Sequence, residues 1–212
     1  GEGQNPDMVL LNWRKLEDHF GTDSEYLGFL RDSPSAAQRL CHILSNSRFL
    51  GDALNKSVES VTWLGSDNDL QPRSRESLDV QTHASLERNA GSINDFANSI
   101  RAMRRHEIER IGLGWMSGVI DDKASLAGMT DVYDAAIDAS LTWAIRHQTQ
   151  EMGLDEAPAA IAVIGMGRYG GREVNFSSDA DVIIIYRPSD NADDNQANLF
   201  ARKVQEDLRA IL

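Results

Sequence analysis

The sequence predicts a mainly α protein with a smaller α+β part at its C-terminal end. Three observations support this fold class. Apolar side chains recur at helical spacing from residue 5 to about residue 150. Two short apolar runs, 159–164 and 177–186, flank a glycine-rich segment, which is typical of two buried strands joined by a turn. The last stretch, 194–212, is amphipathic and predicts a helix with Leu199, Val204, Leu208 and Ile211 on one buried face.

The helical region divides at residues that commonly begin or end helices. The expected starts are Asn5-Pro6, Thr22, Ser33-Pro34, Ser47, Ser57, Ser74 and Thr130-Asp131. Gly21 and Gly91 are expected stops, and residues 65–73 and Asp121-Asp122 are expected loops or turns. A domain boundary is expected near residues 125–130 or 153–157. We place it so that residues 1–128 form a helical domain and residues 129–212 form a second domain.

Composition excludes several classes of protein. The chain has 212 residues, a net charge of −12 and a single cysteine, Cys41. The acidic balance argues against nucleic acid as a partner, because phosphate-backbone binding needs clustered Lys and Arg. The apolar runs are too short to span a membrane. No signal peptide is visible and no intrachain disulfide can form, so a reducing cytoplasmic location is expected.

One segment, 165–181, combines two features that carry chemistry. Residues 165–171 read Gly-Met-Gly-Arg-Tyr-Gly-Gly directly after the first expected strand, and glycines let a backbone approach a phosphate closely. Asp179 and Asp181 begin the second expected strand, where alternate side chains share a face about 7 Å apart. Two adjacent carboxylates repel each other, and a divalent cation relieves this repulsion. Oxygen ligands suit Mg²⁺, which completes its coordination with water and substrate phosphates.

Each feature alone has a simpler explanation. A glycine cluster after a strand is usually a tight turn, and Asp-x-Asp is often a capping or solvated pair. The segment lacks the Lys-Ser/Thr end of a Walker loop, and a strand rather than a long helix follows it, unlike in a dinucleotide fingerprint. The ordered combination of strand, Gly-x-Gly-x-x-Gly-Gly, spacer, Ser-Asp-x-Asp and strand is what indicates a site.

The segment resembles the signature of the glutamine synthetase adenylyltransferase family, which has the form Gly-Met-Gly-Lys-Leu-Gly-Gly-x-Glu-Leu-Asn-x-x-Ser-Asp-x-Asp-Leu. The matching residues are Gly165, Met166, Gly167, Gly170, Gly171, Glu173, Asn175, Ser178, Asp179 and Asp181. Leu is replaced by Tyr169, Val174 and Val182, and Lys by Arg168, whose planar group would not hold a phosphate as Lys does. The helical stretches 31–34, 47–50 and 104–111 are also similar to the family, so the resemblance covers most of the chain.

This resemblance implies a polymerase-β-like nucleotidyltransferase domain at 129–212, of which only the first half is present. Asp179 and Asp181 would hold catalytic Mg²⁺. The residues that would seat the triphosphate of ATP are Gly165, Gly167, Arg168, Gly170, Gly171, Ser177 and Ser178. The acceptor would be a tyrosine hydroxyl of glutamine synthetase, and phosphate would remove the AMP again. A PII-type nitrogen signalling protein would be a partner of the whole enzyme.

The superfamily also uses a third carboxylate on a later strand, in a family motif resembling Asp-x-Arg-Leu-Arg-Pro, which this sequence lacks. We therefore expect a fragment, inactive alone, and residues 31–34 and 104–107 favour the C-terminal, adenylylating half. Two alternatives remain. One is another polymerase-β-like transferase with a different acceptor, a protein or a nucleic acid. The other is a non-catalytic helical regulatory or interaction module with a degenerate nucleotide site.

Two charged helical segments have a simpler expected role. In the segment 101–109, three arginines (Arg101, Arg104 and Arg105) are followed by Glu107 and Glu109, which is typical of a solvated, ion-paired helix face. Contact with an acidic partner or with the active-site cleft is the alternative for this segment. Asp131, Asp134 and Asp138 also indicate a solvated face.

Overall fold

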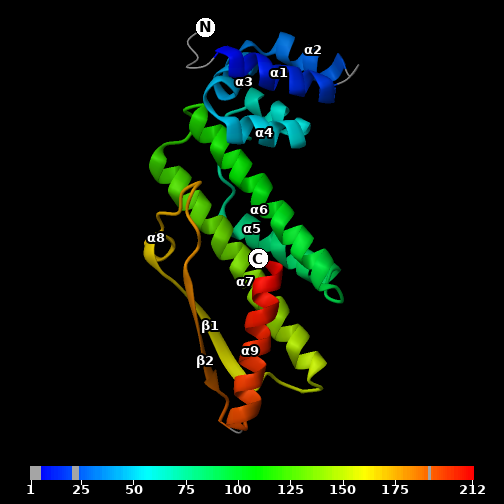
Figure 1. Ribbon diagram of the computed structural model, residues 1–212, viewed down its shortest axis with the longest axis vertical. Helices are drawn as coiled ribbons and strands as arrows, with labels where there is room; N and C mark the ends of the chain where they lie inside the picture. The colour runs from blue at the N-terminus through cyan, green and yellow to red at the C-terminus, as the bar shows by residue number, and fades with distance from the viewer. Residues whose placement is uncertain (1–5, 21–23, 191) are drawn as a thin grey trace. The chain divides into compact units, whose positions relative to one another are not determined.

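The computed structural model describes residues 6–20, 24–190 and 192–212, and these are mainly helical with a small two-stranded antiparallel sheet (Figure 1). This confirms the predicted mainly α fold with a smaller β part. The elements in chain order are α1 (Pro6–Phe20), α2 (Ser24–Asp32), α3 (Pro34–Asn46), α4 (Arg48–Lys56), the 3₁₀ helix η1 (Val58–Gly65), α5 (Arg75–Arg88), α6 (Ile93–Met116), α7 (Asp122–Glu151), β1 (Ala159–Gly165), α8 (Gly167–Gly170), β2 (Val182–Pro188) and α9 (Asp194–Ile211). In the described part of the chain, no helix combines the length and apolar character needed to cross a membrane.

Several helix starts follow from local capping chemistry. The Ser47 hydroxyl accepts a hydrogen bond from the Leu50 N–H at 3.1 Å, and Ser74 accepts one from the Ser77 N–H at 3.2 Å. Each bond satisfies an N–H that the first turn of a helix leaves without a partner. Ser33 and Ser57 precede helical elements without forming such a bond. The expected signals at Asn5, Gly21 and Thr22 lie outside the described residues.

The helix start expected at Thr130-Asp131 is wrong. Helix α7 runs without interruption for 30 residues from Asp122 to Glu151. The Thr130 hydroxyl donates to the carbonyl of Leu126 at 2.9 Å, four residues earlier in the same helix. A Thr that bonds backward in this way occupies a helix interior, which a sequence signal cannot distinguish from a cap.

The described residues group into two compact units. The first comprises residues up to Pro72 together with Glu107–Ser125, and the second comprises Arg73–His106 and Leu126–Leu212. Helices α6 and α7 therefore each supply residues to both units. The division into domains at residue 128 stays a prediction.

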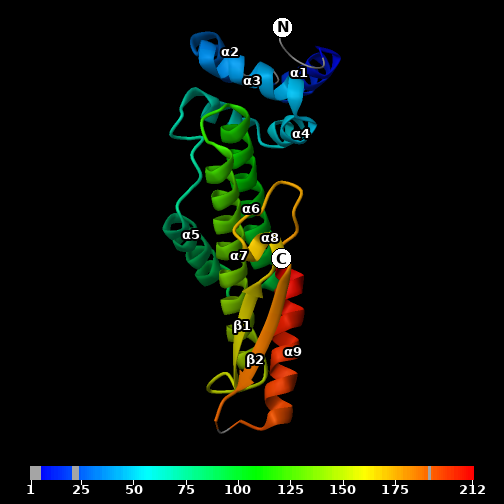
Figure 2. The ribbon, with the colours of Figure 1, turned by 90° about the vertical axis from the view of Figure 1, so that its left-hand side faces the viewer.

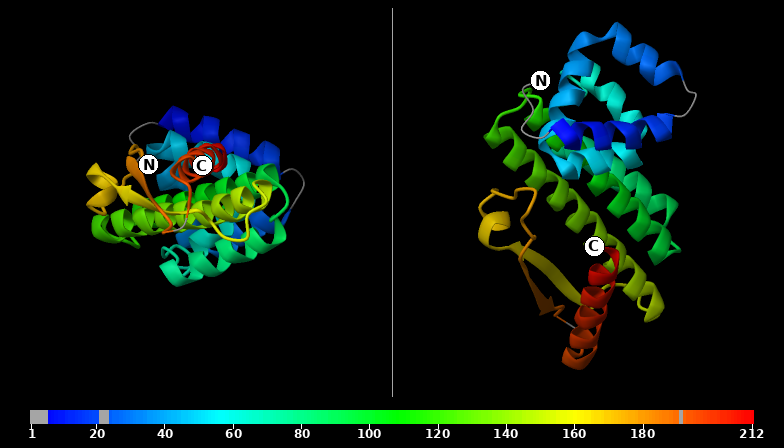
Figure 3. Two further views of the ribbon diagram at one scale, coloured as in Figure 1. Left: turned by 90° about the horizontal axis from the view of Figure 1, so that it is seen from below. Right: turned by 45° about the horizontal axis from the view of Figure 1, so that its top comes forward.

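The first unit has its own hydrophobic core and a buried charged cluster. Helices α1 to α4 and η1 pack together (Figure 3, right) around fully buried leucines and isoleucines, among them Leu16, Leu40, Ile43, Leu54 and Leu64. Glu107 and Glu109 on α6 are only 2% and 5% exposed, so the expectation that they lie on a solvated face is wrong.

The buried cluster is held partly by an arginine. The Arg110 Nε donates to Glu107 Oε2 at 3.2 Å, and its guanidinium lies 4.1 Å from the centre of the Trp63 ring. Glu109 Oε1 is buried without a hydrogen-bond partner in the described structure. Burial raises the pKa of Glu109 to about 7, despite a hydrogen bond with Ser60 that lowers it. A carboxyl in such surroundings favours its neutral form.

The second unit contains the sheet. Strands β1 and β2 pair in register from Ala159↔Pro188 to Gly165↔Val182, and α9 runs along them (Figures 1 and 2). Phe200 of α9 is fully buried in a cluster with residues of β1 and α7. The described buried face of α9 comprises Ala197, Phe200, Ala201, Val204, Leu208 and Ile211. Leu199 is 49% exposed, so its predicted burial is wrong.

The strands are not buried on both faces within this chain. Burial alternates along β1, and Ile164, Ile183 and Ile185 are each 44% to 49% exposed. Strand β2 also begins at Val182, five residues after the expected start at residue 177. An apolar run therefore located the strands correctly but did not reveal which face of each is covered.

Candidate functional site

The glycine-rich segment forms a tight turn at the end of β1. After Met166, the short helix α8 follows, and the Gly170 and Gly171 N–H groups donate to the carbonyls of Met166 and Gly167 at 2.9 and 3.0 Å. Gly167 has a φ of 52°, in the left-handed region that favours glycine. A Cβ at Gly170 would lie 2.9 Å from the carbonyl carbon of Gly165 and closer still to its oxygen. Only glycine fits this approach of one backbone to another.

The turn brings Asp181 close to Gly167. The Met166 N–H donates to the carbonyl of Asp181 at 2.8 Å, which extends the pairing of β1 and β2 by one step. Asp181 Oδ2 lies 3.8 Å from the position that a Cβ on Gly167 would occupy. Asp181 therefore lies beside the glycine-rich turn.

Asp179 and Asp181 precede β2 rather than lying in it. The argument that strand alternation places both on one face is therefore wrong, because the pairing of β1 and β2 ends at Val182. Both residues are exposed. Arg168 is exposed as well, at the second position of α8.

Ser177 and Ser178 are organised by a residue that the prediction of site residues omitted. Asn175 Oδ1 accepts hydrogen bonds from the Ser177 N–H at 3.0 Å, the Ser177 hydroxyl at 3.0 Å and the Ser178 hydroxyl at 2.8 Å. Asn side chains often fold a loop in this way by replacing backbone partners. Asn175 was visible in the sequence as part of the motif, and its amide fixes the two serines ahead of Asp179.

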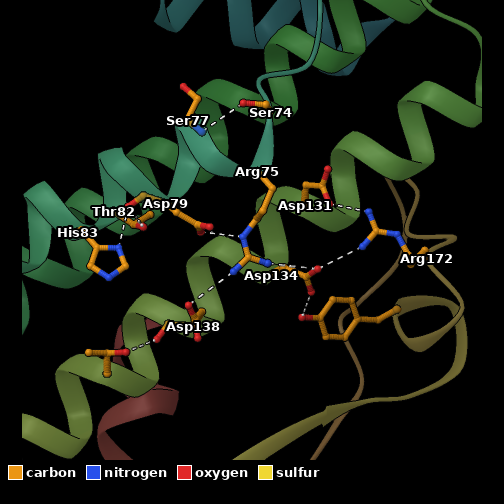
Figure 4. A network of polar contacts seen from close by, with 12 residues as sticks. Ser74, Arg75, Ser77, Asp79, Thr82, His83, Asp131, Asp134, Asp138 and Arg172 are labelled. Carbon is orange, nitrogen blue, oxygen red and sulfur yellow. Dashed lines mark hydrogen bonds and ion pairs between the residues drawn. The ribbon is translucent and has the colours of Figure 1, made fainter.

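A polar network joins the turn to helix α7 (Figure 4). The Tyr169 hydroxyl donates to Asp134 Oδ1 at 2.6 Å, and Arg172 Nη2 donates to Asp131 Oδ1 at 2.6 Å. Arg75 of α5 contacts Asp134 Oδ2 at 3.5 Å and Asp138 Oδ2 at 3.6 Å. The expected solvated face is therefore wrong for Asp131 and Asp134, which are paired and about a quarter exposed. Burial, with the neighbouring Asp134 carboxylate, raises the pKa of Tyr169.

The donor chemistry of the site suits a hard cation. Asp179 and Asp181 offer carboxylate oxygens, the ligand type that Mg²⁺ prefers, and their side chains are engaged in no ion pair within the described structure. No group of three or more His, Cys, Asp or Glu side chains that could hold a metal occurs among residues 6–20, 24–190 and 192–212. Asp179 and Asp181 are thus two residues of this segment that could offer oxygen ligands to such an ion.

Comparisons with known proteins show the family of the chain. Residues 37–212 match the family model described as "Glutamate-ammonia ligase adenylyltransferase". Over its whole length, the chain is 76% identical to a "Bifunctional glutamine synthetase adenylyltransferase/adenylyl-removing enzyme" from Bifidobacterium longum (strain DJO10A), and the match covers 20% of that protein. A protein of the same name from Leifsonia xyli subsp. xyli is 40% identical over 88% of the chain, which covers 18% of that protein. Another from Mycobacterium tuberculosis (strain H37Rv) is 35% identical over 98% of the chain, which covers 21% of that protein.

The fold and the segment define a mainly helical protein in which a glycine-rich turn lies beside an aspartate, Asp181. The chain belongs to the glutamate-ammonia ligase adenylyltransferase family. It spans about a fifth of the length of the curated relatives that it matches.

Proposed function

We propose that this chain is part of an enzyme that transfers AMP from ATP to a tyrosine of glutamine synthetase in the cytoplasm. Family membership and the names of the relatives support this proposal. The observation that carries it is the position of Asp181 Oδ2, 3.8 Å from where a Cβ on Gly167 would lie, so that this carboxylate adjoins a glycine of the turn. We further propose a polymerase-β-like architecture, the reverse reaction by phosphate in the whole enzyme, and a PII-type regulatory partner.

In the proposed reaction, the phenolic oxygen of the acceptor forms a bond to the α-phosphorus of ATP. The bond from that phosphorus to the bridging oxygen breaks, and pyrophosphate leaves. Asp179 and Asp181 would hold Mg²⁺, which supplies charge neutralisation at the phosphate oxygens when bound. The turn from Gly165 to Gly171, with Arg168, would lie against the triphosphate. Asn175 would keep Ser177 and Ser178 in place beside it.

The test uses the complete protein and two isosteric variants, Asp179→Asn and Asp181→Asn. Each removes one negative charge and preserves shape, so we expect a loss of AMP incorporation into glutamine synthetase of about 100-fold or more, typical of removing an electrostatic contribution to catalysis. Asp155→Asn is the matched control, because Asp155 is an exposed aspartate in the loop before β1. Full transfer activity in both site variants would contradict the proposal.

Two further measurements separate the alternatives. Calorimetry with ATP and Mg²⁺ should show binding to the complete protein that Asp181→Asn weakens. Absence of binding would favour an interaction module with a degenerate site. Binding of ATP without labelling of glutamine synthetase would favour a transferase with a different acceptor.

A further inference from the structure

One carboxylate on α7 receives three side chains from two other segments. Asp134 Oδ1 accepts the Tyr169 hydroxyl at 2.6 Å, while Asp134 Oδ2 accepts Arg172 Nη1 at 3.4 Å. Arg75 Nη1 lies 3.5 Å from the same Oδ2, and Arg75 Nε donates to Asp79 Oδ1 at 2.7 Å within α5 (Figure 4). Asp134 is therefore the point at which α5, α7 and the glycine-rich turn meet.

Tyr169 anchors the middle of that turn. It lies in α8 and is only 8% exposed. Its ring is packed so closely on the end of β1 that a Cβ at Gly165 would lie 3.0 Å from its Cδ1. The Tyr133 ring of α7 lies 6.3 Å away, centre to centre. The ring thus fills the space beneath the turn, and its hydroxyl ties the turn to α7.

Arg172 anchors the end of the turn in an unusual conformation. Its φ is 58°, and among the residues that the structure describes, Arg172 is the one other than glycine that has a positive φ. Glycine adopts this region more readily, and other residues remain there where surrounding contacts hold them. Those contacts are the ion pairs to Asp131 at 2.6 Å and to Asp134 at 3.4 Å. The carboxylates of Asp131 and Asp134, which lie one helical turn apart on α7, therefore hold Arg172 at the end of the glycine-rich segment.

The anchored turn is continuous with the proposed reaction site. Gly167, two residues before Tyr169, faces Asp181 Oδ2. The Glu173 N–H, just after Arg172, donates back to the Arg168 carbonyl at 2.7 Å and closes the loop. A displacement of Tyr169 or Arg172 would therefore move the backbone of the 165–171 turn, which lies beside Asp181 and, in the proposed function, against the triphosphate.

We propose that Asp134 is a positioning residue for nucleotide binding: through Tyr169 and Arg172 it holds the 165–171 turn in the geometry that the triphosphate of ATP requires. This inference rests on the proposed function. Asp134 itself touches neither nucleotide nor acceptor in this scheme, so its effect is on the affinity for ATP.

The test compares Tyr169→Phe and Asp134→Asn in the complete protein. Phe keeps the buried ring and loses the hydroxyl, whereas Asn keeps the shape and loses the charge. We expect each to raise the KM for ATP about 10-fold, the usual effect of losing a hydrogen bond to a charged group. The kcat and the KM for glutamine synthetase should change less than about 2-fold. The double variant should be worse than the two single variants by less than the product of their effects, because Tyr169→Phe and Asp134→Asn both weaken the bond between Tyr169 and Asp134.

Asp138→Asn is the matched control. Asp138 lies one helical turn further along α7, contacts Arg75 and is 60% exposed, but has no contact with the turn. It should leave the KM for ATP unchanged. Hydrogen exchange provides a readout that needs no catalysis. The Gly171 and Glu173 amides should exchange faster in the two test variants without nucleotide, and at the wild-type rate in Asp138→Asn.

The outcomes separate this inference from the function on which it rests. An unchanged KM for ATP in both test variants, in a protein that transfers AMP, overturns the positioning role. A reduced kcat with an unchanged KM for ATP also overturns it. That pattern would mean that the variant lowers the amount of folded enzyme and leaves ATP binding unaffected. If the wild-type protein transfers no AMP, the proposed function fails. Exchange at Gly171 and Glu173 then decides by itself whether Asp134 holds the turn.

Discussion

Gly170 and Gly171 are neighbouring glycines of the same motif, and the structure predicts opposite consequences for replacing them with alanine. A Cβ at Gly170 would lie 2.9 Å from the Gly165 carbonyl carbon, whereas a Cβ at Gly171 would have its nearest neighbour, the Gly167 carbonyl oxygen, at 3.4 Å. The first distance is one that real Cβ atoms essentially never show, and the second is an ordinary contact. Gly170→Ala is therefore the perturbation, and Gly171→Ala is its control.

The size of the effect follows from the overlap. To restore a 3.4 Å contact with the Gly165 carbonyl carbon alone, the Gly170 backbone must move about 0.5 Å, and the nearer carbonyl oxygen requires a larger shift. Overpacking of this kind costs about 1–3 kcal/mol when no flexible side chain can yield, and here both partners are backbone. A misplacement of about 1 Å in a reaction site can cost about 100-fold in rate. We expect Gly170→Ala to lower kcat/KM for ATP by at least about 10-fold.

The assay is AMP incorporation into glutamine synthetase by the complete protein over a range of ATP concentrations. Hydrogen exchange across residues 159–173 accompanies it, since it reports the turn whether or not transfer occurs. Gly171→Ala should leave hydrogen exchange across residues 159–173 close to wild type, because its Cβ would make only ordinary contacts. Equal increases in exchange in the two variants, or a wild-type kcat/KM and wild-type exchange in Gly170→Ala, would refute the steric reasoning.

Three further predictions concern the stability of the complete protein, each measured by hydrogen exchange in the segment concerned. Phe200→Ala should destabilise α9 by about 3–5 kcal/mol, because Phe200 is fully buried, whereas Leu199→Ala, at a position 49% exposed, should cost less than about 0.5 kcal/mol. Gly114→Ala should destabilise α6 by about 1–3 kcal/mol, since a Cβ there would collide with the Leu70 carbonyl. Because burial raises the pKa of Glu109 to about 7, the folded state favours its protonated form. The stability of residues 107–116 should therefore fall by about 2 kcal/mol from pH 5.5 to pH 8 and become nearly independent of pH in Glu109→Gln.

Each of these predictions has a contradicting result. Similar losses in Phe200→Ala and Leu199→Ala would mean that the buried face of α9 is misassigned. A neutral Gly114→Ala would mean that α6 can move away from Leu70 at little cost. Stability that rises with pH at residues 107–116, after correction for intrinsic exchange rates, would reverse the assigned state of Glu109.

Features that depend on residues close together in the chain could be predicted before the fold was known. Ser47 and Ser74 cap the helices that they begin, because the bonded N–H groups lie only three residues away. The order of strand, glycine-rich turn and Asp-x-Asp was also readable. This order, with the matching residues of the family signature, indicated the family.

The side chains and surfaces that these residues contact became clear from the folded chain. Asp134 and Asp138 look alike on one helix, yet Asp134 alone of the two meets Tyr169 and Arg172, which follow 35 and 38 residues later. Leu199 and Phe200 are both apolar, but the sheet lies against the side of α9 that carries Phe200. Glu109 has the sequence context of a surface residue and is buried. In each case, the deciding partner comes from a distant segment, and helical spacing fixes which residues share a face without fixing what packs against it.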